Sequence, residues 1–271
     1  MPDTILPAGS AALNTSRVLD LTGKRGLVVG IANASSIAYG CAKAYQALGA
    51  ELAVTYLNPK SERFVRPLAE ELGAPIVMPC DVTAENQLEA VYAEIDRTWG
   101  KLDFILHAIA FAPMQDLHGR VIDCSRTGFM TAMDVSCHSF IRMAKLAAPL
   151  MTNGGTLFAM SYLGANRVVS NYNVMGPVKA ALEAACRYLA FELGPHDIRV
   201  HAISPGPLKT RAASGIKEFD RLLNDAVEHS PLGELVEIED VGFACAYLAT
   251  EFSRRITGGT IYIDGGANIV A

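Results

Sequence analysis

The sequence lacks paired cysteine motifs, and this absence argues against a metal-binding protein and a disulfide-rich protein. Its 271 residues include six cysteines, and no two of them are spaced as Cys-x2-Cys. They are Cys41, Cys80, Cys124, Cys137, Cys186 and Cys245. Scattered single cysteines argue against a metal site or a disulfide framework and indicate reduced, mostly buried thiols. We therefore expect no bound metal and a cytoplasmic protein.

Positive charge is also scarce, and it is not clustered. The chain has 23 Lys and Arg residues against 28 Asp and Glu residues, which gives a net charge of -5. No basic cluster is present that would release counterions from nucleic acid or hold an anionic membrane surface. Neither nucleic acid nor a membrane is therefore an expected partner.

No segment predicts a secretion signal or a membrane span. Residues 1–19 mix polar residues with prolines and contain no continuous apolar run, so we expect a flexible N-terminal extension. The uncharged stretch from Leu146 to Asn166 is long enough to cross a bilayer, but Pro149 and the Asn153-Gly-Gly155 turn divide it. This stretch is predicted to be a helix end, a turn and a strand. The helix that ends there is predicted over Ala132 to Leu150, where apolar residues repeat at helical spacing.

Short apolar runs alternate with helical segments from residue 25 to residue 266. The predicted strands are residues 25–32, 51–56, 74–82, 102–110, 155–160, 201–204 and 260–263. With 51% hydrophobic residues the chain can bury a large core, and no repeat or low-complexity linker divides it. The alternation predicts an α/β fold: one Rossmann-type domain over residues 20–271, with a doubly wound parallel sheet and helices on both faces.

The first predicted strand opens into a glycine-containing turn and a helix, expected over Cys41 to Leu48. Gly30 would let the backbone approach a pyrophosphate, Ser36 adds a hydroxyl, and the start of a helix offers free N–H groups. Glycines occur here at 30 and 40 and do not form Gly-x-Gly-x-x-Gly, so an ordinary tight turn is the alternative interpretation.

Polar residues near the next strands have two interpretations each. The acidic residue that often ends the second strand and binds the adenosine ribose is missing here. Asp81 at the end of the third strand can accept a hydrogen bond from an adenine amino group, or it can cap the next helix. His107 lies inside the apolar fourth strand and is interpreted as a core histidine, with a catalytic histidine as the alternative.

Two phenols and an amine are spaced as if they converge. Tyr172 and Lys179 are seven residues apart, so in a helix they would share one face. Tyr162 follows the strand predicted over 155–160, and open parallel sheets bind ligands at the carboxyl ends of their strands. A phenol with its ordinary pKa of about 10 is a neutral donor, which a nearby ammonium can assist in stabilising an oxyanion. The alternative is a surface pair on an ordinary helix.

The segment from Pro205 to Arg211 leaves the sixth strand as a loop, because its prolines and glycine exclude regular structure. Residues 212–228 follow with an amphipathic pattern. Together they predict a small substrate-binding lid over residues 205–228 that closes on ligands.

The sequence resembles the bacterial enoyl-[acyl-carrier-protein] reductases of the short-chain dehydrogenase/reductase superfamily. The resemblance covers residues 19–270, and its most specific part is Tyr-x6-Lys with a second Tyr ten residues earlier, as in Tyr162, Tyr172 and Lys179. Ordinary members of the superfamily have Tyr-x3-Lys and a serine thirteen residues before the tyrosine, a position that is Ala159 here. Further matching segments are Gly30 to Gly40, Asp81-Val82, Ser161 to Ala165, Asn171 to Gly176, Ala202 to Ser204 and Ala212 to Ile216.

The resemblance implies a set of site residues. The dinucleotide would contact Gly30, Ser36, Ile37, Asp81, Val82, Ile109, Lys179, Leu208, Lys209, Thr210, Arg211 and Ala212. Ala112 would touch the acyl substrate. Leu57 and Pro205 depart from the family pattern, in which many relatives have Gln and Ala.

The resemblance also implies an activity in fatty acid biosynthesis. A hydride would pass from NADH, or from NADPH as the second cofactor, to C3 of a trans-2-enoyl thioester on acyl carrier protein. Tyr172 would stabilise the enolate, Lys179 would hold the nicotinamide ribose, and Tyr162 would border the acyl chain or assist the proton. The family assembly is a homotetramer. The alternatives are a short-chain reductase for ketones or dienoyl thioesters, and a non-catalytic nucleotide-binding protein of the same fold.

Overall fold

The computed structural model describes residues 19–208, 210, 223, 224, 226–228 and 230–270. Seven strands form one parallel sheet in the order β3-β2-β1-β4-β5-β6-β7, which confirms the predicted doubly wound architecture. The strands are β1 (Arg25–Val29), β2 (Glu51–Tyr56), β3 (Ile76–Pro79), β4 (Phe104–His107), β5 (Gly155–Met160), β6 (Ile198–Pro205) and β7 (Thr260–Ile263). All seven lie where the apolar runs predicted them, although β1, β3 and β4 are shorter and β6 is longer than expected.

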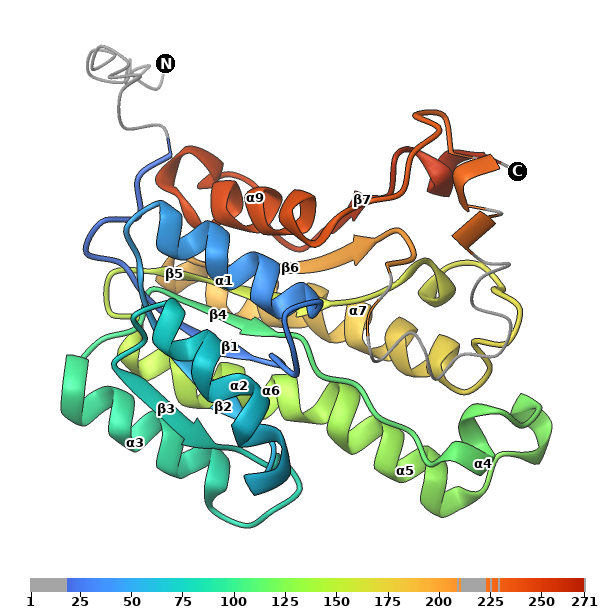
Figure 1. Cartoon of the computed structure of the whole chain (residues 1–271), viewed down its shortest axis with the longest axis horizontal. Coiled ribbons are helices and arrows are strands. Elements are labelled where there is room, and N and C mark those ends of the chain that lie inside the picture. Colours follow the sequence, from blue (N-terminus) through green and yellow to red (C-terminus); the bar gives the residue numbers. More distant parts are fainter. Residues whose placement is uncertain (1–18, 209, 211–222, 225, 229, 271) are drawn as a thin grey trace, which may run out of the picture.

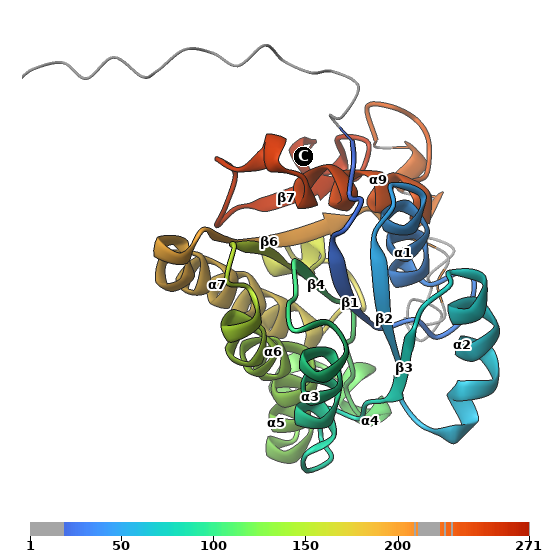
Figure 2. The same cartoon turned by 90° about the vertical axis from the view of Figure 1, so that its left-hand side faces the viewer.

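Helices cover both faces of the sheet, as Figure 2 shows. On one face lie α1 (Ile37–Ala47), α2 (Pro59–Glu71) and α9 (Ile238–Ala249). On the other lie α3 (Gln87–Trp99), α5 (Arg126–Met133), α6 (Ser139–Ala147) and α7 (Met175–Leu193). A short helix, α4 (Met114–Leu117), extends beyond the arrowheads of the strands (Figure 1). The carboxyl edge of the sheet is therefore flanked by helical structure.

Each face of the sheet buries its own core, and successive strand residues alternate between the two. Leu27 and Val29 of β1 pack with α3, α6 and α7, whereas Val28 between them packs with α1 and α9. Because both faces are buried, the strands read as nearly continuous apolar runs. This pattern is what made the strands visible in the sequence.

Helix α1 begins at Ile37, four residues before the predicted start at Cys41. The prediction was wrong because Gly40 was read as part of the turn. Gly40 instead lies where α1 crosses α9, and a Cβ atom there would come within 2.3 Å of the Ile238 carbonyl oxygen. Gly242 on α9 faces it, with a Cβ position 2.5 Å from the Gly40 oxygen. These two glycines allow α1 and α9 to pack closely. The sequence pattern alone does not distinguish this role of Gly40 from that of a turn glycine.

The helix predicted over Ala132 to Leu150 is longer and is interrupted. It consists of α5, a π-helical turn at Asp134–His138, α6 and a 3-10 turn at Ala148–Leu150. The added turn at its start is capped by Ser125, whose hydroxyl accepts a hydrogen bond from the Gly128 N–H at 3.0 Å.

Two predicted segments lie wholly or largely outside the described residues. These are the N-terminal extension, of which only Leu19 is described, and most of the lid, of which residues 205–208, 210, 223, 224 and 226–228 are described. Within the described part of the chain, no helix has the length and apolar character needed to cross a bilayer. The same residues contain no cluster of three or more His, Cys, Asp or Glu side chains arranged to hold a metal ion.

Candidate active site

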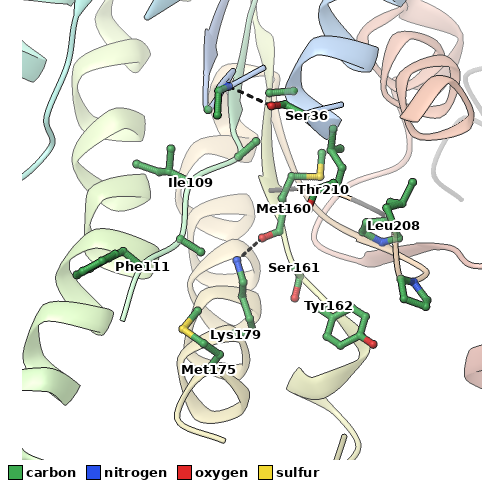
Figure 3. A pocket seen from close by; sticks show the side chains of 18 of the residues that line it. Ser36, Ile109, Phe111, Met160, Ser161, Tyr162, Met175, Lys179, Leu208 and Thr210 are labelled. Atoms are coloured by element: carbon green, nitrogen blue, oxygen red, sulfur yellow. Dashed lines mark hydrogen bonds between the residues drawn. The ribbon is translucent and has the colours of Figure 1, made fainter. Parts of the chain in front are cut away.

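The carboxyl ends of β1, β4, β5 and β6 open into one cavity of about 260 Å³. It brings together ten of the predicted site residues: Gly30, Ser36, Ile37, Ile109, Ala112, Tyr162, Tyr172, Lys179, Leu208 and Thr210. Figure 3 shows that they come from segments far apart in the chain. The position agrees with the general location of ligand sites in open parallel sheets.

The turn after β1 brings the backbone close to the end of β4. Gly30 has φ 128°, and a Cβ atom there would come within 2.4 Å of the Ala108 carbonyl oxygen. Ser36 holds the turn closed, because its hydroxyl oxygen accepts hydrogen bonds from the N–H groups of Ala32 at 3.0 Å and Asn33 at 3.1 Å. Helix α1 then begins at Ile37 beside the cavity, where helix amides favour an anion.

Two tyrosines approach each other at the cavity. The rings of Tyr162 and Tyr172 meet edge to face, with centroids 4.9 Å apart and an interplanar angle of 60°. Burial raises the pKa of Tyr162 to about 12. Burial is also the main cause that raises the pKa of Tyr172, and the nearby Tyr162 and Glu183 add to it. Both phenols are therefore neutral hydrogen-bond donors near neutral pH.

Tyr172 does not lie on the helix that carries Lys179, so that part of the spacing argument was wrong. Helix α7 begins at Met175, and Tyr172 lies in the turn before it. Its neighbours Asn171 and Asn173 have φ values of 63° and 47°, in the left-handed region that asparagine tolerates. The turn still directs Tyr172 into the cavity that Lys179 lines.

Two neighbours fix the Tyr172 turn. The side-chain amide of Asn173 donates to the carbonyl oxygen of Leu117 in α4 at 2.8 Å. Gly164 lies against the ring, and a Cβ atom there would come within 2.3 Å of Cδ1 of Tyr172. The ring is thus held between α4 and the segment that follows β5.

Lys179 is buried, with 5% of its surface exposed, and its Nζ donates to the carbonyl oxygen of Met160 at 2.6 Å (Figure 3). Burial lowers the pKa of the ammonium to about 8, while Cys137, Cys186 and Glu183 oppose that shift. The group therefore remains mostly protonated at neutral pH. It offers a positive charge next to the two phenols.

The segment after β4 forms the opposite wall of the cavity. Ile109 and Ala112 line it, and Ser136 of the π-helical turn accepts a hydrogen bond from the N–H of Phe111 at 3.0 Å. The π-helical turn therefore positions this wall. Small side chains here allow a flat group to approach the backbone.

Some predicted residues do not join this cavity. Asp81 and Val82 follow β3 and do not line it, and one Asp81 carboxylate oxygen accepts from the N–H of Thr83 at 2.9 Å and from its hydroxyl at 2.7 Å. These bonds close a local turn and do not cap the next helix, because α3 begins at Gln87 with Asn86 as its N-cap residue. Three further predicted residues, Lys209, Arg211 and Ala212, lie outside the described part of the chain.

His107 is a core residue, as interpreted from the sequence. It is fully buried, its Nε2 lies 2.7 Å from the Ser139 hydroxyl, and its ring packs against the edge of Phe140. Burial lowers the pKa of its imidazole to about 3. The ring is neutral at physiological pH and does not line the cavity.

Several cavity residues were not predicted from the sequence. They are Ala32, Ala38, Ala108, Phe111, Leu117, Met160, Ser161 and Met175. Most of them lie within two residues of a predicted site residue, so the signal for them was their neighbourhood. Leu117 had no such signal, because only the folded chain brings α4 to the Tyr172 turn.

Comparison with known proteins gives a consistent result. A family model described as enoyl-(acyl carrier protein) reductase matches residues 30–268. The "Enoyl-[acyl-carrier-protein] reductase [NADH] 2" of Rhizobium meliloti (strain 1021) is 47% identical over 251 residues, covering 93% of this chain and 94% of that protein.

Solved structures with the same fold include the enoyl-acyl carrier protein reductase of Anaplasma phagocytophilum in complex with NAD, with a TM-score of 0.89 and 45% identity. That match covers 94% of this chain and 96% of the other. The Bacillus cereus enoyl-acyl carrier protein reductase with NADP+ and indole naphthyridinone has a TM-score of 0.90 and 42% identity, covering 93% of this chain and 98% of the other.

Proposed function

The chain belongs to the enoyl-[acyl-carrier-protein] reductase family, and from this premise we propose that it transfers a hydride from NADH to C3 of a trans-2-enoyl thioester on acyl carrier protein, in fatty acid biosynthesis. The single observation that carries the proposal is the meeting of Tyr162, Tyr172 and Lys179 in one cavity at the carboxyl edge of the sheet. A donor pair and a buried cation are the groups that this reaction requires.

The donor set of the cavity fits a dinucleotide. The Gly30 turn and the start of α1 offer backbone N–H groups to the pyrophosphate, and the buried ammonium of Lys179 suits the ribose hydroxyls. When bound, the reduced nicotinamide supplies the hydride. We assign Asp81 and Val82 to the adenine and Lys209, Arg211 and Ala212 to the phosphates and nicotinamide, on the family resemblance alone.

Tyr172 stabilises the oxygen on which charge develops. Addition of a hydride at C3 turns the thioester carbonyl into an enolate oxygen, and a neutral phenol donates a hydrogen bond to it. A donor placed where charge develops contributes about 10²-fold or more in rate. The raised pKa of Tyr172 keeps its proton on the phenol, so the group acts as a donor and not as a competing anion.

The remaining roles are assigned on the family resemblance, and the position of these residues in the cavity supports them. Lys179 orients the cofactor through its ribose, Tyr162 borders the acyl chain or assists delivery of the proton to C2, and Ala112 contacts the acyl chain. Residues 205–228 serve as a lid over both ligands. In the cell we expect a cytoplasmic homotetramer, packed through the helices before and after β5.

A ketone reductase is the main rival. Ordinary members of the superfamily use a serine at the position of Ala159, which here is fully buried in β5 among core residues and has no hydroxyl. Oxidation of NADH with crotonyl and acetoacetyl thioesters of acyl carrier protein, measured side by side, tests the proposal. Turnover with crotonyl thioester alone supports it, turnover with acetoacetyl thioester alone favours the ketone reductase, and no turnover with either favours a non-catalytic protein.

A further inference from the structure

A buried acidic side chain lies behind the two tyrosines and has no part in the proposed reaction. Glu183 occupies the middle of α7, one helical turn after Lys179, and only 4% of its surface is exposed. Acidic residues are almost never buried this completely unless they are paired or hydrogen-bonded. Its partners therefore indicate what the carboxylate does.

Both carboxylate oxygens of Glu183 accept hydrogen bonds, and both donors come from one short segment. The Ser161 hydroxyl donates to Oε1 at 2.6 Å, and the side-chain amide of Asn166 donates to Oε2 at 2.9 Å. Ser161 directly precedes Tyr162, and Asn166 ends the single turn that follows it. The segment that carries Tyr162 is therefore hydrogen-bonded at both ends to one carboxylate.

The same segment is held from two further sides. The N–H of Ser161 donates to the carbonyl oxygen of Ile203 in β6 at 2.7 Å. The Asn166 amide also donates to the hydroxyl of Tyr262 in β7 at 3.1 Å. From α7, Glu183 holds this segment through the side chains of Ser161 and Asn166, and Lys179 holds the preceding residue, Met160, through its carbonyl oxygen.

We propose that Glu183 is a positioning residue that sets the ring of Tyr162 against Tyr172 by holding Ser161 and Asn166 on either side of it. The placement of the ring is independent of what the enzyme reduces. Its effect on turnover rests on the proposed function, in which Tyr162 borders the acyl chain or assists the proton.

A role in stability alone does not account for this arrangement. Burying a carboxylate is costly, and replacing a whole buried charged cluster by apolar side chains of similar volume is often neutral or stabilising. The neighbouring positions of α7 are small or apolar and pack against the sheet. The carboxylate fixes the direction of two hydrogen bonds, which apolar packing does not do.

The ring placement is tested with 3-fluorotyrosine incorporated only at position 162 of the full chain. Fluorine NMR of the cofactor-free protein reports the surroundings of this ring without any need for activity. We expect one narrow resonance in the otherwise unchanged protein. In Glu183→Gln it should move by more than its linewidth or split, because a glutamine amide has one oxygen and cannot accept from both Ser161 and Asn166. Glu192→Gln, an exposed site on the same helix, is the matched control and should leave the resonance unchanged.

Asn166→Ala keeps the test decisive if Glu183→Gln does not fold. This substitution removes the hydrogen bond to Oε2 of Glu183, at the less buried of its two partners, and leaves the carboxylate in place. We expect the Tyr162 resonance to respond in this variant too. An unchanged resonance in every variant that folds would overturn the proposal.

The catalytic consequence is tested by a double-mutant cycle of Glu183→Gln and Tyr162→Phe, with kcat for the enoyl thioester and Kd for NADH measured in each protein. We expect Glu183→Gln to lower kcat by about tenfold and to change Kd by less than about twofold, with no further loss when Tyr162→Phe is already present. If the losses in kcat from the two substitutions multiplied in the double variant, the proposal that Glu183 acts through Tyr162 would be overturned. Absence of turnover in the unsubstituted enzyme would instead contradict the proposed function, and the fluorine resonance would still decide the role of Glu183.

Discussion

The ring of Tyr162 meets the ring of Tyr172 edge to face, with their centroids 4.9 Å apart. Tyr162 follows β5 and Tyr172 precedes α7, so the ring contact connects these two segments. A displacement of either segment would break it. Edge-to-face pairs contribute about 0.5–1.5 kcal/mol beyond the area they bury. The pair therefore holds two neutral phenols in one cavity, with the ammonium of Lys179 alongside.

The role of Lys179 is tested by Lys179→Met, which keeps the length of the side chain and removes the charge. We expect Kd for NADH to rise by about tenfold or more, which corresponds to about 1.4 kcal/mol, because the ammonium is assigned to the ribose hydroxyls. Titration of the cofactor by fluorescence measures this. Lys145→Met on the exposed side of α6 is the control and should bind NADH as before. Equal affinity in Lys179→Met and the unsubstituted enzyme would refute the assignment.

Asn173 supports Tyr172 through both its backbone and its side chain. Asn173→Gly tolerates the φ of 47° and loses only the bond to the Leu117 carbonyl oxygen, whereas Asn173→Ala loses the bond and adds about 1 kcal/mol of backbone strain. We therefore expect the alanine variant to have the lower Tm and the lower kcat of the two. Thermal unfolding and steady-state kinetics measure these values. An alanine variant as stable and active as the glycine variant would show that the left-handed turn does not matter.

Cofactor choice depends on the residues after β2. Leu57 is 55% exposed, and the side chain of Asn58 is engaged in capping α2, where it accepts from the N–H groups of Lys60 and Ser61. Neither offers positive charge to a 2′-phosphate, so we expect a higher kcat/KM with NADH than with NADPH. The absence of an acidic residue at the end of β2 makes the preference modest.

The matched variant for this preference is Leu57→Arg. It should raise kcat/KM with NADPH relative to NADH by about tenfold, because a guanidinium can bind the phosphate in a bidentate manner. Leu57→Gln is the uncharged control and should leave the ratio nearly unchanged. A clear preference for NADPH in the unsubstituted enzyme would mean that Lys60 or Arg63 reaches the phosphate.

Acid should destabilise the fold through its buried histidines. Burial, with the charge of Arg199 as a smaller cause, lowers the pKa of His201 to about 4. Below about pH 6.5 the unfolded chain takes up a proton that the folded chain excludes. The stability that His201 contributes is thus complete above about pH 6.5 and is lost as the pH falls towards 4, by up to about 1.4 kcal/mol per pH unit.

Urea unfolding across this pH range measures the effect. The free energy of unfolding should decline with falling pH, with a further contribution from His107, whose pKa is lowered to about 3 by burial. His201→Leu removes one titrating group and should make the decline less steep, even if the variant is less stable overall. An identical slope in the variant would contradict the assignment to His201.

The sheet and half of the active site could be predicted from the sequence because local patterns determine them. An apolar run bounded by Gly155 and Met160 identifies β5, and its end then locates Tyr162 at the carboxyl edge. The meeting of Tyr172 with Lys179 was also predicted, but through a helix that the structure does not contain there. Two left-handed asparagines replace that helix, and helical spacing does not reveal them.

Residues whose role depends on partners far along the chain could not be predicted. Glu183 appears in the sequence as one of several charged residues in a helix rich in alanine. Only folding brings it to Ser161 and Asn166. Asp81 illustrates the converse, because its partner Thr83 is only two residues away, and their bond closes a local turn without capping α3. Patterns of hydrophobicity identify elements, whereas the partners of a buried polar group follow from the tertiary arrangement.

The central claim is that the hydroxyl of Tyr172 acts in the transition state of enoyl reduction. Tyr172→Phe keeps the ring, and therefore the contact with Tyr162, and removes only the donor. Steady-state oxidation of NADH with crotonyl-acyl carrier protein gives kcat, and titration gives Kd for NADH. We expect kcat to fall by about 10²-fold while Kd changes little, because the lost bond forms mainly in the transition state. An unchanged kcat with the enoyl thioester would show that the Tyr172 hydroxyl does not stabilise the transition state.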